Sequence, residues 1–275
     1  MRILYDNDYL ASGCTIPFDE STNVDNSTWS WSTSYALAAL SFMSAALVFK
    51  QQKSKALLMV LYFTFTGIGN AVSGASHQFA TSTSEWQYFV LSGVAVGTVL
   101  FANALFMRTG ILFFFYDLSL IANLLWLAIN GGVFATSFIF HSQQAHVAGL
   151  ALALTYFVMS MLYGWVLCAW EKIPGKRWAM LLKILAMWTN IAALVAQFIL
   201  SETCGTGGYE NCFQDCPFSD PIVFNHNALF HILLIGGTFL LTIGELKLPT
   251  HVLWDHYGAA DDDVSEWETR KSFEP

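Results

Sequence analysis

The chain has 275 residues, of which 55% are hydrophobic, 16% aromatic and only 12% charged. A soluble domain carries roughly 25% charged residues, so this composition excludes an ordinary soluble protein and indicates a membrane protein. The formal net charge of −8 comes largely from acidic residues near the two ends of the chain, which we interpret as solvated tails. No basic nucleic-acid patch and no glycine-rich phosphate loop occurs, so we expect no nucleic-acid partner.

Apolar stretches of membrane-spanning length dominate the sequence. A spanning helix needs roughly 20 apolar residues, and seven such stretches occur. We therefore predict an all-α fold, a polytopic membrane protein whose partner is the lipid bilayer. The seven-helix domain is expected at 33–245, after an extracellular or lumenal segment at 1–32 and before a cytosolic acidic tail at 246–275. The predicted spans are 34–49, 56–79, 86–107, 110–131, 146–170, 178–200 and 222–244.

Basic residues predict the orientation of the spans. Lysine and arginine occur between spans one and two, three and four, and five and six, and after span seven, whereas the opposite loops contain none. Short basic loops stay in the cytosol. We therefore expect the N-terminus outside and the C-terminus in the cytosol, which requires an odd number of spans. The expected location is the plasma membrane or a membrane of the secretory pathway.

Four of the five cysteines fall on the predicted outer side. They are Cys14, Cys204, Cys212 and Cys216. An even number of cysteines on the oxidising side predicts two disulfides, in any of three pairings. A zinc cluster is the alternative, which the lack of a CxxC pair disfavours. The sequon that begins at Asn26 lies on the same side and predicts a glycosylation site.

The second span carries a row of polar residues at helical spacing. Thr66, Asn70, Ser73 and His77 recur at four, three and four residues. This spacing places their side chains on one face of a helix. His77 is expected near the outer end of that face, with Ser73 one turn below it.

The seventh span carries two histidines in its outer half. We expect the span to begin at the Ser219-Asp220-Pro221 cap, and His226 and His231 follow. With His77 they predict imidazoles at one depth on two helices. Neutral imidazole is a preferred zinc ligand, and Ser73 is then the candidate catalytic residue beside a metal-bound water. The alternative is that these histidines form hydrogen bonds between helices.

Two motifs resemble those of a known superfamily. The segment Ser73-Gly-Ala-Ser-His77 is similar to the Ser-x-x-x-His element of the CREST membrane proteins, which include alkaline ceramidases, adiponectin/progestin receptors and Per1-like proteins. The segment from Phe224 to His231 resembles the histidine pair near the start of their last core helix. The resemblance implies a seven-helix core that holds zinc through three histidines, here His77, His226 and His231. It also implies hydrolysis of amide bonds in lipids.

The chain departs from the family pattern in two places. His226 and His231 are five residues apart rather than four, which separates them by about 140° on an ideal helix. A π-bulge, or a helix that starts later with Asn225 as its cap, would bring His226 inward. Otherwise Asn227, four residues before His231, takes the ligand position. The family's aspartate is also absent, and Glu85 is the nearest carboxylate.

Other polar residues within or beside the spans are expected to make contacts between helices. Asn190 and Gln197 project from span six, Gln197 near the depth of the histidines. Asn103 is expected to join Asp117 and Asn123. A further metal ligand could come from the outer loop before span five, which holds His141 and His146.

Two classes of function therefore follow from the sequence. The first is a zinc-dependent membrane hydrolase that acts on a lipid amide or ester from the outer side. The second is a non-enzymatic receptor or transporter whose histidines are structural or sense pH. Haem held between His77 and His231 is a weaker third alternative.

Overall fold

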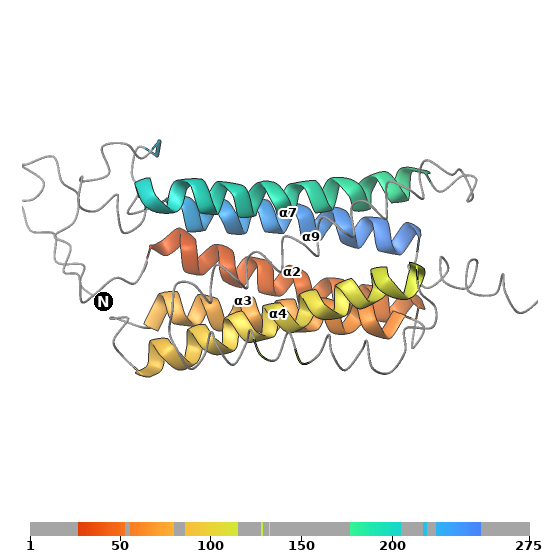
Figure 1. Cartoon of the computed structure of the whole chain (residues 1–275), viewed down its shortest axis with the longest axis horizontal. Coiled ribbons are helices and arrows are strands. Elements are labelled where there is room, and N and C mark those ends of the chain that lie inside the picture. The colour runs from red at the N-terminus through yellow and green to blue at the C-terminus, as the bar shows by residue number, and fades with distance from the viewer. Residues whose placement is uncertain are drawn as a thin grey trace, which may run out of the picture.

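The described part of the chain is a bundle of long helices (Figure 1). The computed structural model describes residues 27–52, 56–79, 86–114, 128, 132, 177–204, 217–218 and 224–248, none of which lies in a strand. The helices are α2 (Thr28–Gln52), α3 (Leu57–Phe79), α4 (Trp86–Phe114), α7 (Arg177–Cys204) and α9 (His226–Lys247). Each contains a stretch long and apolar enough to cross a membrane. These helices fit an integral multi-pass membrane protein.

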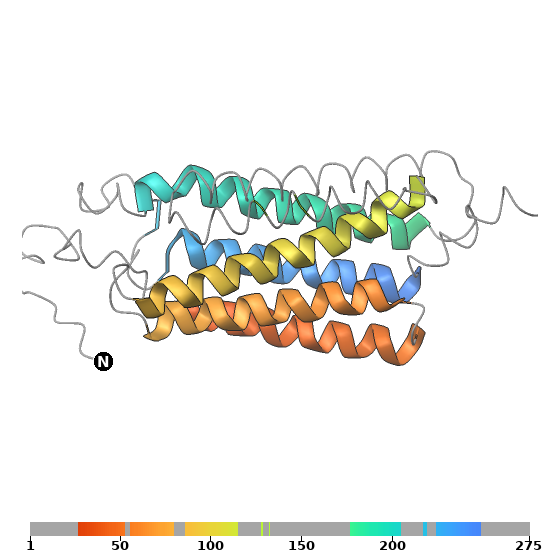
Figure 2. The same ribbon diagram turned by 60° about the horizontal axis from the view of Figure 1, so that its bottom comes forward.

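The helices run roughly along one axis, and successive ones in the chain point in alternating directions (Figures 1 and 2). We call the end at which α2, α4 and α9 begin the outer end, and the opposite end the inner end, after the predicted orientation. α3 packs against α2 and α4, and α9 packs against α2 and α7. Residues far apart in the sequence, near positions 30 and 230, therefore become neighbours.

Two helices begin at least four residues away from their predicted starts, because local caps decide where they start. α2 begins at Thr28 rather than 34, so the expected domain boundary at 33 falls inside a helix. The Ser27 hydroxyl accepts a hydrogen bond from the Ser30 amide at 3.3 Å. α9 begins at His226 rather than 222, so the predicted cap at 219–221 is wrong. Asn225 is the cap, which confirms the later start given as an alternative from the sequence, since its side-chain oxygen accepts hydrogen bonds from the Asn227 and Ala228 amides.

α4 continues past the point at which the sequence predicts a break. The predicted spans end at 107 and resume at 110, whereas the helix runs without interruption to Phe114. The intervening Arg108-Thr109-Gly110 contains no proline. A single glycine costs a helix only about 1 kcal/mol, so it does not end one.

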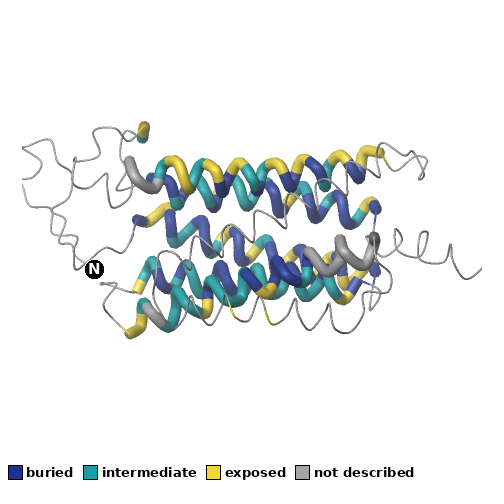
Figure 3. Tube along the Cα trace, in the orientation of Figure 1, coloured by how far each residue is buried: buried dark blue, intermediate teal, exposed yellow. Residues whose placement is uncertain are grey.

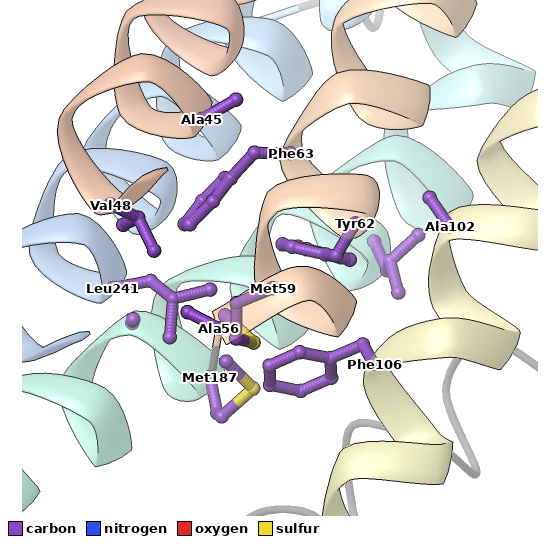
Figure 4. Packing of buried hydrophobic residues seen from close by; sticks show 12 residues of the cluster. Ala45, Val48, Ala56, Met59, Tyr62, Phe63, Ala102, Phe106, Met187 and Leu241 are labelled. Carbon is purple, nitrogen blue, oxygen red and sulfur yellow. The ribbon is translucent and has the colours of Figure 1, made fainter. Parts of the chain in front are cut away.

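Burial follows the bundle geometry (Figure 3). All five described helices contribute to one apolar cluster, in which Phe63 of α3 points toward Val48 of α2 and Phe106 of α4 lies beside Met187 of α7 (Figure 4). Large apolar side chains are also exposed, such as Trp178 at 74% and Phe198 at 62%. Exposed apolar side chains on helices of spanning length are typical of surfaces that face lipid.

Glycines allow close approach between neighbouring helices. A Cβ atom at Gly74 would lie 2.9 Å from the Tyr35 ring of α2, and one at Gly244 would lie 2.7 Å from Cγ of Lys183 on α7. Small residues at helix contacts are typical of membrane bundles, where van der Waals packing drives association. The α2–α3 and α7–α9 contacts are therefore closely fitted.

Candidate functional site

His77 and His231 lie side by side near the outer end of the bundle. Their ring centroids are 6.3 Å apart, and the ring planes are inclined by 74°. His231 is 4% exposed. The structure thus brings together two histidines that are 154 residues apart in the chain, as the sequence predicts.

The first helix supplies hydrogen-bonding partners for His231. The Ser34 hydroxyl lies 3.2 Å from Nδ1 and 3.3 Å from Nε2 of the imidazole. The Thr33 hydroxyl lies 3.4 Å from Nδ1. The ring is therefore held between α2, α3 and α9. Sequence reasoning missed both hydroxyl residues, because nothing in the pattern of α2 shows that α9 is its neighbour.

A cavity of about 230 Å³ extends from His231 into the bundle. Thr66, Asn70 and Ser73 of α3 all line it, which confirms that they share one helix face. The remaining wall is mostly apolar and comes from all five helices. It includes Leu37, Ala95, Val99, Leu194, Phe230 and Leu234.

Asparagines form a polar part of the cavity wall. Asn70, Asn103 and Asn190 come from three different helices and are all buried. The Asn70 amide nitrogen donates to the Thr66 carbonyl at 2.8 Å. The Asn190 oxygen has no hydrogen-bond partner among the described residues. A buried amide oxygen without a donor costs roughly 1–3 kcal/mol, and this oxygen lies against Gly237 of α9.

The first turn of α9 places the remaining candidate ligands. Asn225, rather than the predicted cap, starts the helix, so His226 is its first residue and is buried. Asn227 accepts a hydrogen bond from the Gln197 side chain of α7 at 2.6 Å. Gln197 thus makes the interhelical contact that the sequence predicts, and the alternative ligand Asn227 is held toward α7.

The described histidine, cysteine, aspartate and glutamate side chains form an incomplete set of ligands for zinc. No group of three histidine, cysteine, aspartate or glutamate side chains suited to a metal exists within the described ranges. Two imidazoles on one tetrahedral zinc, with Zn–N bonds of about 2.0–2.1 Å, have ring centroids roughly 5 Å apart. His77 and His231 exceed this separation. The Asn225 cap leaves His226 buried as the first residue of α9, but the five-residue spacing still separates it from His231 by about 140° on an ideal helix. The described residues therefore do not fit a three-histidine zinc centre.

Several predicted residues lie outside the described part of the chain. They are Cys14, Asn26, Glu85, Asp117, Asn123, His141, His146, Cys212 and Cys216. Cys204 is the last residue of α7, and its side chain is also outside the description. Disulfides, glycosylation and a ligand from these residues stay predictions.

The structure also shows a charged pair that the sequence analysis missed. Lys183 of α7 and Glu245 of α9 form a salt bridge of 2.6 Å near the inner end, and Glu245 is fully buried. A lysine within the predicted span 178–200 is a signal that could have been used, because ionisable residues in a membrane usually have a function or a partner.

The described helices therefore define the class of protein: they fit a multi-pass membrane bundle, with a histidine pair above a central cavity. Comparisons with models of protein families, with curated proteins and with solved structures find no match to this chain.

Proposed function

We propose that this membrane protein binds a small amphiphilic molecule in its central cavity, as a receptor or transporter does. The cavity beside His231 is the observation that carries this proposal. Ligand sites are mostly apolar concavities with a few polar groups that orient the ligand. Here the apolar wall accommodates a short hydrocarbon chain, and Ser73 and His231 offer hydrogen bonds to a polar head.

The second candidate function is the zinc-dependent hydrolysis of a lipid amide or ester. The observation that favours it is the position of His77 beside His231, with Ser73 on the wall of the same cavity. A third ligand is needed, from His226 after a local rearrangement or from a residue outside the described ranges. Binding needs no third ligand, so it is the better supported function.

Octanamide is a probe that serves both candidates, since it has a short chain and an amide head. Its binding to purified protein in nanodiscs is measured by native mass spectrometry, and bound zinc by elemental analysis. Ala95→Phe fills the cavity and should weaken binding at least tenfold. Ala39→Phe, at an exposed position of α2, is the matched control and should not change it.

The outcomes separate the two functions. No octanamide binding, or equal binding to both phenylalanine variants, contradicts the cavity as a binding site. One zinc per wild-type chain that is lost in His231→Ala supports hydrolase function, while Ser73→Ala should then keep the metal. Wild-type protein without zinc contradicts the hydrolase.

We further propose seven spans with the N-terminus outside. α4 ends and α7 begins at the same end of the bundle (Figure 1), and a pair of spans between them fits this geometry. The basic loops supply the orientation. A tag after Pro275 should then be labelled only in permeabilised cells. Labelling in intact cells would reverse the topology.

A further inference from the structure

A cluster of polar residues lies at the inner end of the bundle, apart from the histidine site. We define the inner polar cluster as Ser44 and Gln52 of α2, Lys183 of α7, and Thr242 and Glu245 of α9. Lys183 Nζ lies 2.6 Å from Glu245 Oε2, and the side chains are 13% and 0% exposed. Both α7 and α9 are apolar enough to span a membrane, and the charged pair contributes nothing to that property.

Hydroxyl groups lie along the bundle between Glu245 and the central cavity. Thr242 lies one turn before Glu245, and its hydroxyl is 2.7 Å from the Ser44 hydroxyl. Thr238, one further turn along α9, lines the cavity. Thr238, Thr242 and Glu245 therefore occupy successive turns of α9, from the cavity to the buried carboxylate. Ser44 adds a second hydroxyl from α2 at the middle of this path.

Gln52 provides an independent indication that another donor visits the cluster. Its amide nitrogen donates to the Glu245 backbone carbonyl at 3.0 Å. Its side-chain oxygen is buried and accepts no hydrogen bond from the described residues, and the residue is 7% exposed. A buried acceptor of this kind normally has a partner. Water, or hydronium in transit, supplies such a donor.

A contribution to stability alone does not explain why Lys183 and Glu245 form a buried ion pair. Buried ion pairs are weak sources of stability and can often be replaced by apolar residues at no cost. Ionisable residues within membrane spans commonly belong to proton relays or ion pathways. The inner polar cluster has both a carboxylate that can take up a proton and hydroxyls that lie between this carboxylate and the cavity.

We propose that Lys183 and Glu245 form a proton-exchange site that connects the cavity with the inner end of the bundle. A proton from water at the inner end binds the Glu245 carboxylate and gives a neutral acid beside the Lys183 ammonium. The same proton then leaves toward the cavity through the Thr242 and Ser44 hydroxyls, each of which accepts one proton and releases one. The ion pair is thereby restored, and no other bond changes.

The other charged residues that the structure describes at this end lie outside the cluster. α2 and α7 are the helices packed against α9. At the inner end they bring Lys50 and Arg177, and α9 itself brings Lys247, all three of which are exposed. Lys183 makes a direct contact with Glu245. The proposal does not depend on what the cavity binds.

Proton flux into proteoliposomes tests this inference. The full-length protein is reconstituted with a pH-sensitive dye inside the vesicles, and a pH gradient is imposed. Wild type should conduct protons at least tenfold faster than protein-free vesicles. Glu245→Gln should reduce the flux to the protein-free level, and Thr242→Val should reduce it at least threefold. Lys247→Met removes an exposed charge at the same end and should leave the flux unchanged.

A double variant keeps the test valid if Glu245→Gln does not fold. Lys183→Met with Glu245→Met removes both charges together, so no unpaired charge remains, and a thermal melt confirms that it is folded. It should conduct no faster than protein-free vesicles. Wild-type flux at the protein-free level, or wild-type flux in the folded double variant, would overturn the proposal.

Discussion

Gly237→Ala is expected to destabilise the bundle by about 2 kcal/mol relative to Gly236→Ala, because overpacking a close contact typically costs about 1–3 kcal/mol. A Cβ atom at Gly237 would lie 2.1 Å from the Asn190 oxygen and 3.2 Å from the Ala186 carbonyl of α7. At Gly236 the nearest atom is Thr189 Cγ2, at 3.8 Å. The measurement is unfolding in mixed micelles of detergent and dodecyl sulfate, followed by circular dichroism.

The two adjacent glycines give a matched comparison. Both substitutions add one methyl group to the same helix, and both gain the same helix propensity. Only their distance from α7 differs. Equal stability of the two variants would mean that α7 and α9 do not approach as closely as the structure shows.

The class of the protein and the positions of most helices could be predicted from sequence. A membrane span needs a long apolar run whatever its neighbours are, so such runs are visible locally. The helix starts depend on single side chains. Pro221 suggested a first turn, but Asn225 caps α9 with two hydrogen bonds to backbone amides. When two candidate capping residues lie a few positions apart, their residue types alone do not show which one starts the helix.

The cavity face of α3 was predictable for a related reason. Thr66, Asn70 and Ser73 share one helix, so helical periodicity alone places them together. The pairing of His77 with His231 followed from assigning both to the same depth. The contact of His231 with Ser34 was not predictable in this way, because it requires α2 and α9 to be neighbours.

The same reasoning explains why the charged pair was missed. Lys183 lies inside an apolar run, whereas Glu245 lies just past the predicted end of span seven at 244. Only the packing of α7 against α9 brings them together. The glycine at position 244 permits this approach, since its missing Cβ leaves room for the Lys183 side chain.

Lys183→Met is expected to destabilise the protein by about 3–5 kcal/mol, the usual cost of leaving one partner of a buried ion pair alone. Glu245 is fully buried and has a short side chain, so its carboxylate cannot move out to the inner surface when its partner is lost. Glu245→Gln should cost less, about 1–2 kcal/mol, because the long Lys183 side chain can extend toward the inner surface and keep its charge in water. Unfolding in mixed micelles at neutral pH measures both values.

Two further variants show whether the charge itself is responsible. Lys183→Arg preserves the charge and should recover much of the loss, although its planar head does not fit the same geometry. The double variant with methionine at both positions should be more stable than Lys183→Met alone, because it leaves no unpaired charge in the bundle. Should the double variant instead lose as much stability as the two single losses added together, the residues do not interact. In that case the 2.6 Å contact between Lys183 and Glu245 would contribute nothing to the packing of α7 against α9.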